Sequence, residues 1–171
     1  MKQNIFLIGF MGAGKSTIAR TMEKQFGMVL TEMDEEIERQ EGMPISEIFA
    51  VHGEEYFRQL ETAFLEGLEQ RENMVVSCGG GVPMRECNVK AMRKSGQIVY
   101  LSAKPATIYA RVKDSHNRPL LEGNMNVAYI EELLERRMPN YLAAADVTVS
   151  TEGKSGQEIC REILERCGRI M

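Results

Sequence analysis

One segment of the chain has residue types and a spacing suited to binding phosphate. The run Gly9-Phe-Met-Gly-Ala-Gly14-Lys15-Ser16 satisfies the pattern G-x-x-x-x-G-K-[ST]. Its glycines let the backbone curl so that successive N–H groups point at phosphate oxygens, and a helix N-terminus there adds partial positive charge. In such loops the lysine reaches the β- and γ-phosphates and the serine hydroxyl binds Mg²⁺. We expect the nucleotide to be held by consecutive residues, namely Gly12, Ala13, Gly14, Lys15, Ser16 and Thr17.

The segments that must position this loop alternate between two periods. Short apolar runs of strand length are followed by longer runs of helical period. The expected strands are Asn4–Ile8, Met28–Thr31, Met74–Ser77, Gln97–Leu101 and Val147–Ser150. The expected helices are Ser16–Phe26, Glu35–Glu41, Glu54–Glu69, Arg85–Lys94, Pro105–Val112, Ala128–Arg137 and Gln157–Cys167. This alternation predicts an α/β fold with a five-stranded, mostly parallel sheet flanked by helices.

Composition limits the class of protein and the kind of partner. The 171 residues, 43% hydrophobic and 27% charged, fit one globular domain over 1–171. A formal net charge of −4 argues against a nucleic-acid or anionic-membrane partner, so an anionic substrate needs a local cluster of Lys and Arg. No apolar run approaches the roughly 20 residues of a transmembrane helix. The four cysteines form no C-x-x-C pair, and we expect reduced thiols in a cytoplasmic monomer.

Polar or glycine residues follow two of the expected strands, at the sheet edge where open α/β sheets bind ligands. Asp34 comes after the second strand, where an acid can position a substrate hydroxyl and accept its proton. The alternative is that it caps the helix that starts at Glu35, and the two roles can coexist. Gly79-Gly80-Gly81 comes after the third strand, and three glycines there allow a ligand to approach the backbone. Arg58 and Arg137, taken alone, are typical of exposed surface arginines.

Taken together, these segments resemble the shikimate kinases over nearly the whole chain. The similar segments, besides the phosphate-binding loop, are Glu32-Met-Asp34, Gly53-Glu54-Glu55-Tyr56-Phe57-Arg58 with Glu61, Gly79-Gly80-Gly81-Val82, Arg118-Pro119-Leu120-Leu121 and Arg137-x-x-x-Tyr141. The resemblance implies a P-loop kinase fold and Mg²⁺-dependent transfer of the ATP γ-phosphate to a hydroxyl of shikimate. The products would be shikimate 3-phosphate and ADP, a step of aromatic amino-acid biosynthesis.

The resemblance also implies roles for single residues. The catalytic groups would be Lys15, Asp34 and Arg118. Shikimate would contact Asp34, Arg58, Gly80, Gly81 and Arg137, with both arginines on its carboxylate, to which a guanidinium fork is suited. Mg²⁺ would be held by Ser16 and Glu32. Glu32 stands where the family has Asp, and a longer carboxylate can serve through water with altered geometry.

Two longer segments receive roles from the same resemblance and from composition. The helical segment at about 34–69 would bind the substrate. Residues 113–126, rich in Asn, Gly and charge, resist assignment to a helix or strand, so we expect a mobile lid that brings Arg118 over the γ-phosphate. Arg111, on the helix before it, would pack near the adenine and complete the ATP site together with Arg118.

Other protein classes share the phosphate-binding loop. A regulatory GTPase would need N-K-x-D and D-x-x-G elements, and an adenylate kinase would have Pro at the position of Met11 and a D-G-[FY]-P-R segment. None of these is present in the sequence. A gluconate-type small-molecule kinase is the alternative within kinases, and a non-catalytic ATP-binding module is the alternative of another class.

Overall fold

The computed structural model of the chain describes residues 3–113 and 126–169. Its strands form one parallel sheet in the order β2-β3-β1-β4-β5. The strands are β1 (Asn4–Ile8), β2 (Val29–Glu32), β3 (Met74–Ser77), β4 (Gly96–Ser102) and β5 (Val147–Ser150). The predicted α/β fold with a five-stranded sheet is confirmed, and every expected strand boundary lies within one residue of the observed one.

Helices occupy the connections between the strands. They are α1 (Lys15–Phe26), α2 (Met33–Glu41), α3 (Ile45–His52), α4 (Glu54–Glu66), α5 (Glu86–Ser95), α6 (Pro105–Val112), α7 (Val127–Ala144) and α8 (Gly156–Arg166), with a 3₁₀ turn η1 (Val82–Met84). Within the described residues, no helix is both long and apolar enough to span a bilayer.

Several helices differ from the sequence-based expectation. α2 begins two residues earlier than expected and α4 ends three residues earlier, at Glu66, and the larger differences concern α3 and α7. α3 was not expected; it begins after Pro44 and is anchored by the buried Ile48. α7 was expected to end at Arg137 but continues through Pro139 to Ala144. Proline normally interrupts a helix because it lacks an N–H donor. Here the following turn buries Tyr141 and Ala144 in the core, and this packing holds the helix beyond the proline.

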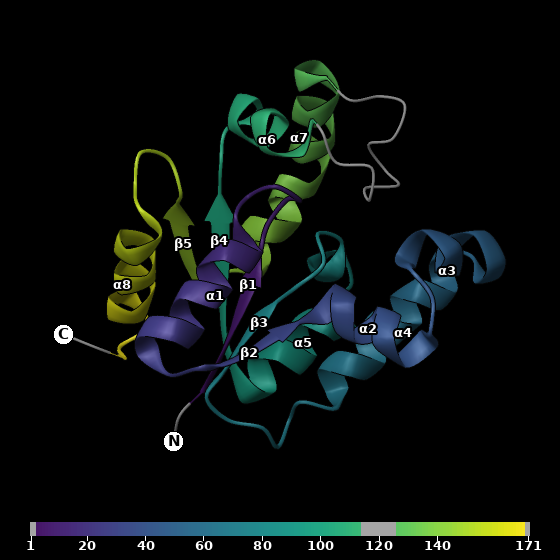
Figure 1. The fold of residues 1–171 in the computed structure, drawn as a ribbon, viewed down its shortest axis with the longest axis horizontal. Coiled ribbons are helices and arrows are strands. Elements are labelled where there is room, and N and C mark those ends of the chain that lie inside the picture. The colour runs from purple at the N-terminus through teal and green to yellow at the C-terminus, as the bar shows by residue number, and fades with distance from the viewer. Residues whose placement is uncertain (1–2, 114–125, 170–171) are drawn as a thin grey trace.

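The sheet separates two hydrophobic cores (Figure 1). Alternate residues of β1 point to opposite faces, so that Phe6 belongs to one core and Leu7 to the other. Helices α1 and α8 pack together over one face, and α5 and α7 pack on the other. Helices α2, α3 and α4 form a separate group beside the β2 and β3 edge of the sheet. Strands buried on both faces read as continuous apolar runs, which is why they could be located from sequence.

The strand order places the functional segments at one end of the sheet. The connection after β1 runs by α1 toward β2 on one side of the sheet, and the connection after β3 runs by α5 to β4 on the other side. A crevice forms outside the carboxyl ends of the strands where the direction of the connections changes in this way. The loop at 9–14 follows β1, Glu32 ends β2, and Gly79 to Gly81 follow β3. All three segments therefore meet at the same edge.

Candidate active site

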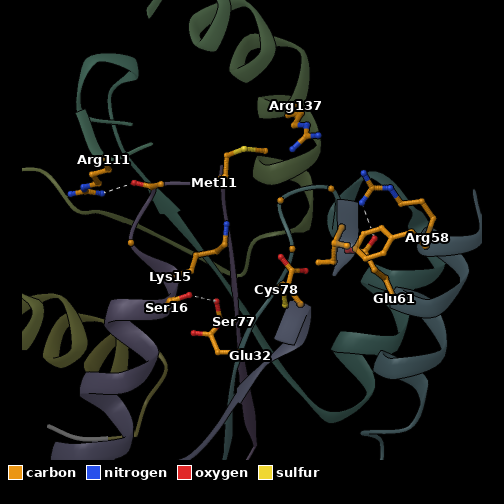
Figure 2. Close-up of a pocket in the computed structure, with 18 of the residues that line it drawn as sticks. Met11, Lys15, Ser16, Glu32, Arg58, Glu61, Ser77, Cys78, Arg111 and Arg137 are labelled. Carbon is orange, nitrogen blue, oxygen red and sulfur yellow. Dashed lines mark hydrogen bonds and ion pairs between the residues drawn. The ribbon is translucent and has the colours of Figure 1, made fainter. Parts of the chain in front are cut away.

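A cavity of about 360 Å³ lies at this edge of the sheet (Figure 2). The phosphate-binding loop and the start of α1 form one end of it, and α3, α4 and α7 contribute to the other. Of the predicted site residues, Gly12, Gly14, Lys15, Ser16, Thr17, Glu32, Asp34, Arg58, Gly80, Gly81, Arg111 and Arg137 all line it. Elements far apart in the sequence therefore bring the predicted residues together in one cavity. Ala13 is buried beneath the loop.

The phosphate-binding loop has the curled backbone that its glycines predict. Gly12 has φ 84° and Gly14 has φ 102°, both in the left-handed region that favours glycine. The Lys15 side chain is buried, and its Nζ donates to the carbonyl oxygens of Gly9 at 2.5 Å and Phe10 at 3.1 Å. The ammonium group is thus held at the mouth of the loop, where a phosphate bound to the loop would meet it.

Three oxygen-bearing side chains meet where β2 and β3 end beside α1. The hydroxyl oxygens of Ser16 and Ser77 are 3.5 Å apart, and Glu32 pairs with Ser77 in the register of the two strands. One carboxylate oxygen of Glu32 is buried and has no hydrogen-bond partner among the described residues. A carboxylate and two hydroxyls are hard ligands of the kind that Mg²⁺ takes together with phosphate oxygens and water. This set of oxygen atoms therefore fits Mg²⁺. Ser77 was not expected at this site from the sequence.

Arg58 is not the surface arginine that its sequence context alone suggests. Its side chain is 13% exposed, and Nη1 donates to the buried carboxylate of Glu61 at 2.8 Å. Nε and Nη2 both donate to one oxygen of Glu54, at 3.3 and 3.2 Å. Three of its five N–H donors are thereby engaged, which leaves two for a ligand.

Glu61 is a buried carboxyl group at the acceptor end of the cavity. Its side chain is 0% exposed, and this burial raises the pKa of Glu61 to about 7, although the Arg58 guanidinium opposes the rise. The Asp34 carboxylate adds to the rise in the pKa of Glu61. From the sequence, Glu61 was expected only as part of the motif around Arg58, without a role of its own. The sequence feature that could have indicated its contact with Arg58 is its position three residues later, on the same face of α4.

Arg137 is also buried, in contrast to the arginine beside it. It is 9% exposed, and its Nη1 is a buried nitrogen without a hydrogen-bond partner among the described residues. Arg136 is 64% exposed and pairs with Glu132 at the surface. Because successive helix residues are about 100° apart, the two arginines face different surroundings, and Arg137 faces the cavity. A surface role for Arg137 is therefore wrong.

Asp34 occupies the second position of α2, which begins at Met33. The residue in the N-cap position is Glu32, whose backbone is extended and whose side chain makes no capping hydrogen bond. The alternative of Asp34 as a helix N-cap is therefore wrong. Its carboxylate lines the cavity and contributes negative charge next to Glu61.

Two predicted nucleotide contacts remain, Arg111 and Arg118, and only Arg111 lies within the described residues. Arg111 Nη1 donates to the carbonyl oxygen of Gly12 at 2.9 Å, so this side chain lies against the phosphate-binding loop. Arg118 and nearly all of the expected lid at 113–126 lie outside the residues that the structure describes.

Comparison with known proteins agrees with this geometry. A family model described as shikimate kinase matches residues 11–168. A shikimate kinase of Dehalococcoides mccartyi is 45% identical over 162 residues, covering 95% of this chain and 92% of that protein. One of Persephonella marina is 42% identical over 164 residues, covering 96% and 98%.

Solved structures agree as well. The shikimate kinase from Acinetobacter baumannii in complex with shikimate has a TM-score of 0.90 and 33% identity, covering 96% of this chain and 92% of that one. A gluconokinase from Sinorhizobium meliloti, with a TM-score of 0.59 and 21% identity over 98% of this chain and 92% of that one, shares the fold. The resemblance found in the sequence motifs is confirmed: this chain belongs to the shikimate kinase family.

Proposed function

We propose that this protein transfers the γ-phosphate of ATP to a hydroxyl of shikimate, giving shikimate 3-phosphate and ADP. The observation that carries the proposal is the single cavity that joins Lys15 and the phosphate-binding loop to the buried arginines Arg58 and Arg137. Asp34 lines the same cavity. A phosphate donor and a small carboxylic acid can thus be held next to each other. The family membership supports the same reaction.

At the nucleotide end, the loop N–H groups and the N-terminus of α1 would bind the phosphates of ATP. The backbone of Gly12, Ala13 and Gly14 is curled for this purpose, with Ser16 and Thr17 at the start of the helix. Lys15 would exchange its contacts with the two loop carbonyls for the β- and γ-phosphate oxygens. Arg111, fixed on Gly12, would lie beside the nucleotide.

Ser16 and Glu32 would hold Mg²⁺, with Ser77 as a neighbour that orients the Ser16 hydroxyl. When bound, Mg²⁺ supplies neutralisation of the charge on the phosphate oxygens. The buried Glu32 oxygen supports this assignment, because an unpaired carboxylate oxygen is costly unless a cation or water is bound to it.

At the acceptor end, Arg58 and Arg137 would bind the carboxylate of shikimate. Both side chains are largely buried before the ligand arrives, so little side-chain entropy would be lost on binding. Gly80 and Gly81 would form the floor below the ring. Guanidinium groups suit a planar carboxylate because they donate two parallel hydrogen bonds.

Asp34 would act on the hydroxyl that is phosphorylated. Its carboxylate accepts the hydrogen bond of this hydroxyl and takes the proton as the oxygen attacks the γ-phosphorus. The new O–P bond forms while the bond from the γ-phosphorus to the bridging oxygen breaks, and that oxygen leaves with ADP. Arg118, from the expected lid, would stabilise the transferring phosphoryl group and exclude water.

A coupled assay of ADP formation tests the proposal directly. We expect ADP formation that requires shikimate, ATP and Mg²⁺ together. Gluconate in place of shikimate tests the gluconate-type alternative, for which the gluconokinase likeness supports only the fold. ADP formation that depends on gluconate and not on shikimate would contradict the proposal, and nucleotide binding without transfer to either acid would favour an ATP-binding module.

The setting of the enzyme is part of the same proposal. We place it in the cytoplasm and in aromatic amino-acid biosynthesis, and the four free cysteines fit a reducing compartment. We propose a monomer, because the phosphate-binding loop and the residues assigned to the acceptor line one cavity without a partner chain. Light scattering coupled to gel filtration tests whether the protein is a monomer.

A further inference from the structure

The three glycines after β3 do not owe their identity to backbone angles. None of Gly79, Gly80 and Gly81 has a φ in the left-handed region, and Gly81 has φ −92° and ψ −2°. The φ values at these three positions therefore do not require glycine. The glycines of the phosphate-binding loop differ, because Gly12 and Gly14 have positive φ. Something other than the backbone must therefore require glycine at 79, 80 and 81.

The space that a Cβ would take at each position is occupied by a charged side chain of the protein itself. At Gly79 a Cβ would lie 2.7 Å from Glu61 Oε2 and 3.1 Å from Asp34 Oδ1. The first distance is shorter than Cβ atoms adopt in proteins, and the second is tighter than most Cβ contacts. Gly79 therefore allows two carboxyl groups to approach the strand end together.

The next two glycines each accommodate one arginine. At Gly80 a Cβ would lie 3.0 Å from Arg137 Nη1. At Gly81 it would lie 2.6 Å from Arg58 Nη1 and 2.9 Å from both Cζ and Nη2, so the guanidinium group packs against the backbone there. Each glycine is thus paired with a different charged partner.

We propose that Gly79, Gly80 and Gly81 act as positioning residues that set the places of the acceptor-site charges: Gly79 for Asp34 and Glu61, Gly80 for Arg137, and Gly81 for Arg58. This deepens the proposed function and rests on it. The same glycines that would lie below the acid also leave room for the catalytic and binding side chains of the protein itself.

The consequence of an added methyl group follows from what it would displace. The displaced atoms are the ends of long side chains, which can move without unfolding the protein. A catalytic group moved by about 1 Å can cost on the order of 100-fold in rate. At Gly79 the added methyl group would displace Glu61 more than Asp34, which need move by only a few tenths of an ångström. Gly79→Ala should therefore lower kcat by up to about tenfold, with a smaller change in the KM for shikimate.

Gly80 and Gly81 lie against arginines, so alanine at these two positions should change the KM for shikimate more than kcat. Gly81→Ala should raise the KM for shikimate on the order of tenfold or more while kcat changes less, because Arg58 binds the acid and takes no proton. Gly80→Ala should do the same through Arg137. A methyl group could also touch the acid itself, so the test must separate displacement of the arginine from direct contact.

A double-mutant cycle makes this separation. If Gly81 acts through Arg58, then Gly81→Ala in an Arg58→Ala background should leave the KM for shikimate unchanged. If the methyl group touches the acid, the tenfold effect should persist in that background, and the proposal for Gly81 is overturned. Gly80→Ala with Arg137→Ala gives the matching cycle.

Gly67→Ala serves as the control. Gly67 ends α4 with φ −71°, and a Cβ there would lie 3.4 Å from its nearest neighbour, the Phe64 carbonyl oxygen, which is ordinary contact. We expect its kcat, KM and melting temperature to equal those of the parent.

A ligand-free crystal structure of Gly81→Ala gives a second readout, in which the Arg58 guanidinium should be displaced from position 81. The proposal is overturned if the three glycine variants keep parental kcat and KM, or if all three fail to fold. An absence of shikimate phosphorylation by the parent protein would instead refute the proposed function, so the two failures are distinguishable.

Discussion

The two ends of the cavity are built in different ways. At the nucleotide end, the residues proposed to bind phosphate are consecutive, from 12 to 17, and most of them would act through backbone N–H groups. At the acceptor end, the proposed residues Asp34, Arg58 and Arg137 come from α2, α4 and α7 and would act through their side chains. A contiguous loop carries its chemistry in a short motif. A dispersed site exists only once the helices have packed.

The two ends also differ in how they hold charge before a ligand binds. Lys15 donates hydrogen bonds to two backbone carbonyl oxygens of its own loop. Arg58 donates hydrogen bonds to the side-chain carboxylates of Glu54 and Glu61, of which Glu61 is buried and Glu54 is 57% exposed. At the acceptor end, removing Arg58 would therefore leave the buried Glu61 carboxyl group without this partner.

Lys15→Ala should have the largest effect and should act on the nucleotide end alone. Loss of the ammonium group removes charge stabilisation of the transferring phosphate, so we expect kcat to fall about 10³-fold or more. Two loop carbonyls lose a donor, which costs roughly 1–2 kcal/mol of unfolding free energy and leaves the fold intact. Steady-state kinetics measures the fall in kcat, and unfolding followed by circular dichroism measures the loss of stability.

Lys24→Ala is the control, because Lys24 is an exposed lysine in the last turn of the same helix. Parental turnover in Lys15→Ala would remove the loop from the mechanism.

Asp34→Asn should separate chemistry from binding at the acceptor end. Asparagine keeps the size and a hydrogen-bonding group but cannot take the proton, so kcat should fall about 10²- to 10³-fold while the KM for shikimate changes far less. Glu35→Gln, at the exposed next position of α2, should leave both constants unchanged. A rise in KM with parental kcat would make Asp34 a binding residue.

Arg58→Ala and Arg137→Ala should weaken shikimate binding and spare the nucleotide. Each removes a charge-assisted contact worth roughly 1.5–3 kcal/mol, about 10- to 150-fold in Kd, while ATP affinity stays near the parental value. Titration calorimetry with each ligand measures this. Arg136→Ala, the exposed neighbour, is the matched control. If both variants bind shikimate as the parent does, the carboxylate clamp is wrong.

Glu61→Gln should reveal the buried charge network through pH. Burial raises the pKa of Glu61 from 4.5 to about 7 in the folded protein. The raised pKa favours the folded state below pH 4.5, and that contribution is lost as pH rises through about 7. Glutamine does not ionise, so the variant does not lose stability in this way. The free energy of unfolding of the variant relative to that of the parent should therefore increase between pH 5 and pH 8, by at most roughly 3 kcal/mol.

Urea unfolding at several pH values measures this difference. A difference that does not change with pH would show that Glu61 ionises as an ordinary surface carboxyl group does.

Much of the fold was predictable because its signals are local. The buried strands read as apolar runs, and the glycines and lysine of the loop appear in one motif between a strand and a helix. α3 was missed, since it is a short helix of eight residues whose burial rests on Ile48. α7 was ended too early because the proline is a local signal, whereas the burial of Tyr141 that sustains the helix is not.

The sequence by itself determined the α/β alternation and the phosphate-binding loop, and its motifs determined the family resemblance. Tertiary packing decided which charges face the cavity. Arg136 and Arg137 are adjacent and chemically identical, and only the position of α7 over the sheet buries the second. Likewise, the three glycines acquire their charged neighbours from α2, α4 and α7. Burial depends on atoms supplied by distant segments, so no local pattern could have shown it.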